Sequence, residues 1–300
     1  MANNIRLIAT DLDGTFFDSK GQVIPANIEA FRDANAAGIA VAISSGRCLT
    51  DIRYVHETIG LKTWIIGFNG AIVSAPDSDD CIFAQPIDRA LLEKLLTFLE
   101  DELDIYYHIS CVGVRYVLAR GRHLPDAERT RVGLNAHGIR IEFINTWREA
   151  PDEILNNCMK IIASTRIPEE AARLQKETPE LGLPLTITSS WWNNIEVVAE
   201  GVDKGEGIRK LCEHLGITTD QVMVLGDQMN DYAMFKVAGW PVAMGNGDDR
   251  IKAAARIVSG TNDEAGVAQA VRRYALGESE EELAAKIGHC TIQGGDAEAF

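Results

Sequence analysis

Two carboxylates one residue apart, Asp11 and Asp13, follow an apolar run over residues 5–10 and come just before Gly14. Alternation along an extended chain sends both side chains the same way, past the end of the predicted strand. Two anions held this close repel each other unless a cation lies between them. The pair therefore favours chemistry with a bound metal ion and an oxygen-rich electrophile, and a phosphate ester bridged by Mg²⁺ meets both needs. The alternative is a solvated turn in which Asp and Gly merely end a strand.

The segments around this pair alternate between strand and helix. The patterns predict strands over 5–10, 39–43 and 64–67, with helices over 25–38 and 48–59 between them. Such a series is typical of an α/β fold with a doubly wound, Rossmann-like parallel sheet. Ligands of these sheets bind at the carboxyl ends of the strands, which is where the two carboxylates fall.

The regular alternation stops at an acidic turn near residues 76–80 and returns with a predicted strand over 195–199. Between these points helices and strands alternate less regularly, which indicates an inserted α+β domain. The predicted organisation is a core over 1–82 and 193–276, an inserted cap domain over 83–192, and a tail over 277–300 that is acidic and then glycine-rich.

Other polar groups also fall where a predicted strand ends or a predicted helix begins. They are Ser44, Ser45, Gly46 and Arg47 after strand 39–43, Lys204 at a helix start, and Asp227, Asn230 and Asp231 after strand 221–225. Each has a plainer interpretation. Serine often caps a helix, and Asp231 would cap the helix that follows it. A lysine at a loop-to-helix junction is usually solvated.

Four motifs together resemble those of the haloacid dehalogenase superfamily of aspartate-nucleophile phosphatases. They read DLDGT from Asp11, SSGR from Ser44, DKGEGI from Asp203 and GDQMNDYAMF from Gly226. Further stretches, among them FNGA from Phe68 and VAMGNG from Val242, resemble the Cof-type subfamily, whose subtype-B cap domain lies between the second and third motifs. Sucrose phosphatases and phosphomannomutases share this general plan. The resemblance covers about 1–80 and 190–275, and over the cap it rests on length and placement.

The resemblance implies a role for each motif residue. Asp11 would be the nucleophile that forms an aspartyl-phosphate, and Asp13 would protonate the leaving oxygen and then deprotonate water. Ser45 would donate a hydrogen bond to the phosphoryl group. Ser44 is the less favoured of the two serines, because the family places its hydroxyl residue directly before Gly-Arg. Lys204 would bridge phosphate and Asp11 as a point charge.

The resemblance also implies a Mg²⁺ site and a substrate pocket. The metal ligands would be Asp11, the backbone carbonyl of Asp13, and Asp227, with Asn230 and Asp231 at the edge of the site. The residues expected to line the pocket for substrate are Ser44, Gly46, Arg47, Asn69, Gly70 and Asn230.

Composition narrows the kinds of partner and the cellular location that we expect. The formal net charge of −15 disfavours nucleic acid, and no apolar run approaches the roughly 18–20 residues that cross a bilayer. Six scattered cysteines without a CxxC pair, and an N-terminus without a secretory pattern, suit the cytoplasm.

Arginines between Arg115 and Arg131 form either a solvated face or a positive pocket for an anionic substrate. Trp191 and Trp192, at the predicted return from cap to core, would stack on a sugar or pack at a hinge.

These features lead to an expected function. The chain is expected to be a cytoplasmic, Mg²⁺-dependent phosphatase of small phosphorylated metabolites, with sugar phosphates first and phosphorylated cofactors such as pyridoxal phosphate next. We expect a monomer or weak homodimer. Two alternatives stay open, namely a phosphomutase or phosphotransferase of the same fold and a non-catalytic regulatory protein. The complete set of acid, base, lysine and metal ligands weighs against the last.

Overall fold

The computed structural model describes residues 4–78, 80–135, 137–287 and 293–294, and the chain divides into two compact units. The first unit comprises the described residues up to Ser45, then His56–Ile82, and those from Asp203 onward. The second comprises Gly46–Val55 and Phe83–Val202. Within the described ranges, no helix has the length and apolar character needed to cross a bilayer.

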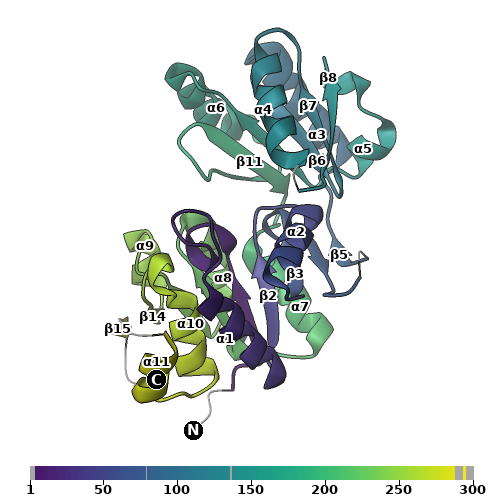
Figure 1. Ribbon diagram of the computed structural model, residues 1–300. Coiled ribbons are helices and arrows are strands. Elements are labelled where there is room, and N and C mark those ends of the chain that lie inside the picture. The colour runs from purple at the N-terminus through teal and green to yellow at the C-terminus, as the bar shows by residue number, and fades with distance from the viewer. Residues whose placement is uncertain (1–3, 79, 136, 288–292, 295–300) are drawn as a thin grey trace. The chain divides into compact units, whose positions relative to one another are not determined.

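A nine-stranded sheet organises the first unit, in the order β15-β14-β13-β12-β1-β2-β3-β4-β5 (Figure 1). The six strands from β14 to β3 pair in parallel, β4 is antiparallel to β3, and β15 is antiparallel to β14. The α/β prediction is therefore confirmed. The strands are β1 (Leu7–Thr10), β2 (Ala40–Ser44), β3 (Trp64–Gly67), β4 (Ile72–Ser74), β5 (Cys81–Ala84), β12 (Val222–Gly226), β13 (Trp240–Ala243), β14 (Ile257–Val258) and β15 (Gln293–Gly294).

Helices cover both faces of this sheet. Strand order advances from β1 to β3 in one direction and from β12 to β14 in the other, so right-handed crossovers place α1 and α8 on opposite faces. Helix α10 packs on α1, and α7 packs on α8 (Figure 1). The helices are α1 (Pro25–Ala36), the end of α2 (Leu49–Ile59) from His56 onward, α7 (Lys204–Leu215), α8 (Tyr232–Val237), α9 (Asp249–Ala254), α10 (Gly266–Ala270) and α11 (Glu280–Ile287).

The second unit is built on a six-stranded, mostly antiparallel sheet in the order β10-β11-β9-β6-β7-β8. Its strands are β6 (Tyr106–Cys111), β7 (Val114–Leu118), β8 (Arg140–Ile144), β9 (Lys160–Ser164), β10 (Leu185–Thr188) and β11 (Asn194–Ala199). Its helices are α3 (Arg89–Thr97), α4 (Leu124–Asn135), α5 (Asp152–Asn156) and α6 (Pro168–Glu180). A mixed unit of this kind agrees with the inserted α+β domain that the sequence indicates.

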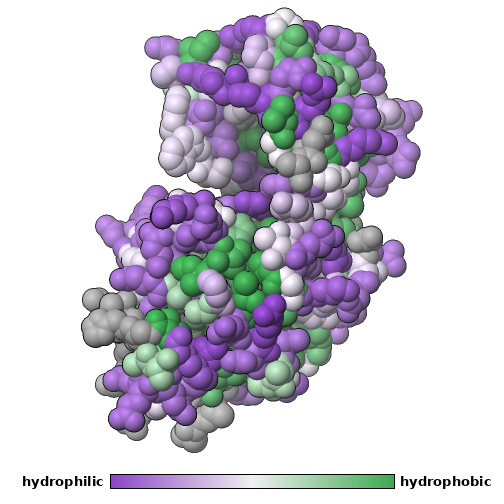
Figure 2. Space-filling model, in the orientation of Figure 1, coloured by the Kyte–Doolittle hydropathy of each residue, from purple (hydrophilic) through white to green (hydrophobic). Residues whose placement is uncertain are grey.

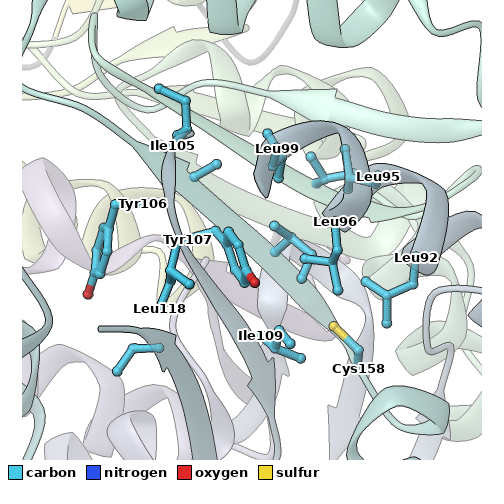
Figure 3. Packing of buried hydrophobic residues seen from close by; sticks show 14 of the residues in the cluster. Leu92, Leu95, Leu96, Leu99, Ile105, Tyr106, Tyr107, Ile109, Leu118 and Cys158 are labelled. Carbon is cyan, nitrogen blue, oxygen red and sulfur yellow. The ribbon is translucent and has the colours of Figure 1, made fainter. Parts of the chain in front are cut away.

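The two faces of this second sheet differ in chemistry. On β6, Tyr107 and Ile109 point toward the leucines of α3 and the turn that follows it, whereas Tyr106 points the other way (Figure 3). Alternation places Tyr106, His108 and Ser110 on that second face. The first face belongs to an apolar core, and the second carries polar side chains beside apolar ones such as Val117.

Two expectations about the domain boundary need correction. The strand predicted over 195–199 in the core is β11, which pairs antiparallel with β9 and β10 in the second unit. The chain therefore leaves that unit after Val202 rather than at residue 192. Trp191 and Trp192 consequently lie in the turn between β10 and β11, with 67% and 52% of their surface exposed, instead of at a return to the core.

Two other segments have features that we did not predict. Residues 46–55 cluster with the second unit, although we placed them in the core. Within the tail, Glu280–Ile287 form helix α11, which buries Leu283. A short segment with few large aliphatic side chains is a weak sequence signal, and packing on the rest of the unit decides its structure.

The arginines between Arg115 and Arg131 do not form one basic patch. Arg120 and Arg122 pair with acidic residues outside α4, and Arg129 and Arg131 pair with Asp126 and Glu128 of α4 itself. Arg115 alone of the five is buried on a strand, at 7% exposure. Hydrophilic residues cover most of the visible surface of both units in Figure 2, with hydrophobic residues in smaller patches.

Candidate active site

Asp11 lies directly after β1, and its backbone N–H donates to the carbonyl of Leu225 on the neighbouring strand at 2.9 Å. All four residues of β1 are buried, as expected for a parallel strand covered on both faces. The chain then turns at Gly14, where φ is +80° and an added Cβ would lie 2.4 Å from Asp227 Oδ2. A glycine here lets the carboxylate of the β12 loop lie against the turn that follows Asp11.

Lys204 brings a buried positive charge to Asp11. It is the first residue of α7, and its Nζ donates to Asp11 Oδ1 at 2.8 Å and to Asp231 Oδ1 at 2.6 Å. Asp203 caps the helix by accepting a hydrogen bond from the backbone of Glu206. The start of the helix also contacts Gly70, where an added Cβ would lie 2.0 Å from the carbonyl oxygen of Asp203. A lysine held this way is not a solvated junction residue.

Asp227 and Asp231 complete the acidic group after β12. Asp231 Oδ2 accepts from the backbone N–H of Asp227 at 2.9 Å and of Gln228 at 3.1 Å. Thr15 donates its hydroxyl to Asp227 Oδ1 at 3.0 Å. One Asp231 oxygen thus binds backbone amides of the turn that precedes it and the other binds Lys204, whereas its side chain makes no capping hydrogen bond to α8, the helix that follows. Its expected place at the edge of a Mg²⁺ site stays a prediction.

The site is short of positive charge. One ligand oxygen from each of Asp11, Asp227 and Asp231 lies within 4.8 Å of the others, and Lys204 is the cation bonded to two of them. Burial raises the pKa of Asp11 to about 7, against the lowering effect of Lys204, and burial together with Asp231 raises the pKa of Asp227 to about 6. Burial also opposes the charge of Lys204, but the carboxylates of Asp11 and Asp231 outweigh it and raise the lysine's pKa.

The donors of this group suit a hard divalent cation. Mg²⁺ takes oxygen ligands, usually one or two carboxylates with water and phosphate oxygens. Asn230 adds an amide oxygen that is buried and has no hydrogen-bond partner among the described residues. A bound Mg²⁺ would relieve the repulsion between the carboxylates and return Asp11 to its charged form.

The raised pKa values lead to an expected pH dependence of stability. Without metal, the folded protein holds protons on Asp11 and Asp227 that the unfolded chain has released by about pH 4. Stability is therefore expected to fall by on the order of 2–4 kcal/mol as pH rises from 5 to 8 in EDTA. Urea unfolding across this range, with and without Mg²⁺, measures it. Mg²⁺ should remove most of the loss, and an equal slope in an Asp11→Asn, Asp227→Asn double variant would contradict the assignment.

The other predicted site residues lie as follows. Ser45 is buried after β2; its N–H donates to Ile66, and its carbonyl accepts from the N–H of Asn69 at 3.0 Å. Ser44 is buried, with a hydroxyl that has no partner among the described residues. Asp13 is exposed in the turn after Asp11. Gly46 and Arg47 belong to the second unit, where Arg47 Nη1 lies 3.3 Å from Asp51, so their substrate contacts stay a prediction.

Three residues that shape the site were missed from the sequence. Thr15 and Gln228 hold the carboxylate of Asp227, and Asn246 donates from Nδ2 to the carbonyl of Gly14 at 2.8 Å. Thr15 ends the first motif and Gln228 lies in the fourth, so both were within reach as neighbours of an acidic ligand. Asn246 lies in the MGNG stretch, but sequence alone gives no sign that it holds the first turn.

Comparison with known proteins agrees with this geometry. Residues 8–271 match the family model described as haloacid dehalogenase-like hydrolase. The chain is 32% identical to the phosphatase YwpJ of Bacillus subtilis (strain 168), over 89% of this chain and 99% of YwpJ. It is 28% identical to the pyridoxal phosphate phosphatase YbhA of Escherichia coli (strain K12), over 90% and 99% respectively.

A solved structure shares the fold over nearly the same span. A haloacid dehalogenase-like hydrolase from B. subtilis superposes with a TM-score of 0.77 at 30% identity, covering 89% of this chain and 99% of the other. Family model, relatives and structure each extend over both units. The chain therefore belongs to the haloacid dehalogenase-like hydrolase family, in its Cof-type phosphatase subfamily.

Proposed function

We propose that this enzyme hydrolyses phosphate monoesters of small metabolites in a Mg²⁺-dependent reaction that passes through an aspartyl-phosphate on Asp11. Sugar phosphates are the first candidates and phosphorylated cofactors the second. The observation that carries the proposal is the buried carboxylate of Asp11, 2.8 Å from Lys204 Nζ and grouped with two further carboxylates at the end of β1. This carboxylate is bonded to a fixed cation and grouped with oxygen atoms that suit a metal ion. Such a group is positioned as a nucleophile rather than as a core residue.

The chain's own residues can supply both steps. An Asp11 oxygen forms a bond to phosphorus while the bond from phosphorus to the leaving oxygen breaks, and Asp13 gives that oxygen its proton. Asp13 then takes a proton from the water that attacks the aspartyl-phosphate, which releases phosphate and restores Asp11. Lys204 and the Ser45 hydroxyl stabilise charge on the phosphoryl oxygens. Mg²⁺, when bound by Asp11, Asp227 and neighbouring oxygens, supplies charge neutralisation for the same group.

Phosphate release from a panel of esters tests this proposal. The panel contains hexose phosphates, pyridoxal phosphate, flavin mononucleotide and p-nitrophenyl phosphate, each with Mg²⁺ and with EDTA. The expected result is Mg²⁺-dependent release from at least one metabolite. The name of YbhA is the reason to include pyridoxal phosphate. Isomerisation of a hexose phosphate without free phosphate would overturn the proposal in favour of a mutase, and no turnover of any ester would favour a non-catalytic role.

The two proposed roles of Asp13 can be separated with an Asp13→Asn variant. A nitrophenolate leaving group needs no proton, so transfer of phosphate to Asp11 should persist while hydrolysis of the intermediate slows by roughly 10²–10⁴-fold. Rapid mixing with p-nitrophenyl phosphate should then show a burst of about one nitrophenol per enzyme before slow turnover. Slow release with no burst would contradict the assignment of Asp13 as the base of the second step.

Location and assembly are also proposed. All five cysteines in the described part of the chain are free thiols, which supports a reducing cytoplasm. The net charge of −15 supports small phosphorylated metabolites rather than nucleic acid or anionic membranes as partners. We propose a monomer or weak homodimer, which light scattering of the purified protein would check.

A further inference from the structure

A buried arginine in the second unit has no partner for its charge. Arg115, on β7, is 7% exposed; its Nε is buried without a hydrogen-bond partner, and no ion pair of its guanidinium is found among the described residues. An arginine keeps its charge in every protein environment, and burial of such a charge is costly unless it is paired. A buried, unpaired guanidinium therefore indicates that an anion belongs beside it.

The neighbours of Arg115 on the polar face of the sheet offer donors rather than acceptors. Strand register places Ser110 directly opposite Arg115 on one side and Lys160 on the other. Directly opposite side chains lie about 4.5–5.5 Å apart at Cβ, so the serine hydroxyl lies between two cations. Ser110 is fully buried, and its hydroxyl has no partner among the residues that the structure describes. We call Arg115, Ser110, Lys160 and His108 the Arg115 cluster.

Lys160 differs from Arg115, because its own charge is matched. Its Nζ lies 2.5 Å from Glu196 Oε2 and donates to the carbonyl of Gly46 at 3.0 Å, within the same unit. Glu196 thus compensates one cation of the cluster and Arg115 remains uncompensated. The cluster has a net positive charge in a protein whose formal charge is −15.

His108 adds a buried ring nitrogen that can donate. Thr130 Oγ1 accepts from the Tyr106 hydroxyl at 2.8 Å and lies 3.4 Å from His108 Nε2, so the Thr130 hydroxyl proton is available to Nε2. Burial, together with Arg115 and Lys160, lowers the pKa of His108 to about 3, so the ring is neutral. With Thr130 donating to Nε2, the one ring proton is on Nδ1, which is buried and has no partner in the described part of the chain.

We propose that the Arg115 cluster binds a small oxyanion, a carboxylate or a phosphate group, with Arg115 as its main partner and Ser110 and His108 donating further hydrogen bonds. The planar guanidinium matches two oxygens of such a group at once. Two sources share this chemistry, namely a second acidic group on the substrate and a separate small acid. The first source rests on the proposed phosphatase function, and the second does not.

Direct binding of succinate in EDTA tests the site without any catalysis. In the absence of metal the acidic group around Asp11 repels a dicarboxylate, so binding reports on other sites. We expect succinate to bind the wild-type protein and raise its melting temperature, with an affinity at least tenfold lower in Arg115→Gln and reduced in Ser110→Ala. Arg140→Gln removes the same charge from an arginine whose side chain is 65% exposed and should leave binding unchanged.

Matched esters then identify the source of the anion. The pairs are 3-phosphoglycerate with glycerol 3-phosphate and 6-phosphogluconate with sorbitol 6-phosphate, which differ only in a terminal carboxylate. If the substrate supplies the anion, kcat/KM favours the acid of one pair by about 10- to 100-fold, and Arg115→Gln removes the preference. Succinate binding without ester preference assigns the site to a separate acid.

Two results would overturn the anion site and the proposed function separately. If neither succinate binding nor ester preference depends on Arg115, the anion site is wrong. If no ester is hydrolysed, the proposed function fails while the succinate result still decides the site. Arg115→Gln also separates binding from a structural role, because removal of an unpaired buried charge should maintain or raise the melting temperature without succinate, whereas loss of a structural arginine would lower it.

Discussion

Replacement of Asp11 with Asn is expected to lower kcat for phosphate-ester hydrolysis by roughly 10⁴-fold or more. The amide has nearly the same shape and still offers Lys204 an oxygen, 2.8 Å away in the wild-type protein, so the fold should persist. An amide oxygen is a far weaker nucleophile than a carboxylate, and the variant has no other group after β1 in the same position. Phosphate release at saturating Mg²⁺ and substrate measures the effect.

A matched control and a stability measurement make this result specific. Asp249→Asn changes the same functional group on α9, where the side chain is fully exposed, and should leave kcat within about twofold. Asp11→Asn should also make the metal-free protein more stable at pH 8, because it removes one of three clustered carboxylates. A variant that keeps a tenth of wild-type turnover would show that the nucleophile lies elsewhere.

The parts of the fold that could be predicted were those set by local pattern and general topology. The apolar runs ending at Thr10 and Gly67 are strands because a sheet buried on both faces requires continuous hydrophobic sequence. Asp11 and Asp227 could be expected to meet, since the carboxyl ends of paired parallel strands lie at one edge. Lys204 had no such rule, and its place beside Asp11 came from resemblance alone.

The sheet to which a strand belongs was harder to predict. Residues 194–199 have the β pattern in any context, and we assigned them to the core because a helix follows. Asn194 and Glu196 alternate with Ile195 and Val197, which is the pattern of a strand with one polar face. The alternation of polar and apolar residues in this segment therefore favours the antiparallel sheet in which β11 is found. This alternation is visible in the sequence, but we gave more weight to the helix that begins at Lys204.

Contacts across long sequence distances could not be predicted at all. Asn246 holds the carbonyl of Gly14 over 232 residues, and Lys160 lies opposite Ser110 only through the pairing of β6 with β9. A single sequence carries no information about register between strands this far apart. The same reason explains why the arginines from Arg115 to Arg131, adjacent in sequence, have different surroundings in the structure.

Lys204→Met is expected to have the largest effect on stability. The wild-type ammonium is fully buried and binds Asp11 and Asp231, so the variant leaves two buried carboxylates without their cation. Removal of one member of a buried ion pair costs about 3–5 kcal/mol. Urea unfolding in EDTA at pH 8 should show this loss. At pH 5.5 the loss should be smaller, because the pKa of Asp11, already about 7 with the lysine present, rises further and the carboxyl becomes neutral.

Comparison with a control variant shows whether this loss of stability comes from the buried charge. Lys210→Met, on the same helix, removes a lysine that pairs with Glu206 and Glu213 at the surface and should leave the urea midpoint nearly unchanged at either pH. Combining Lys204→Met with Asp11→Asn should cost less than the two separate effects added together, because the second change removes the charge that the first leaves unpaired. Additive effects, or a loss that does not vary with pH, would mean that Lys204 stabilises the unit through the packing of its side chain, and its proposed electrostatic role at Asp11 would then have to be abandoned.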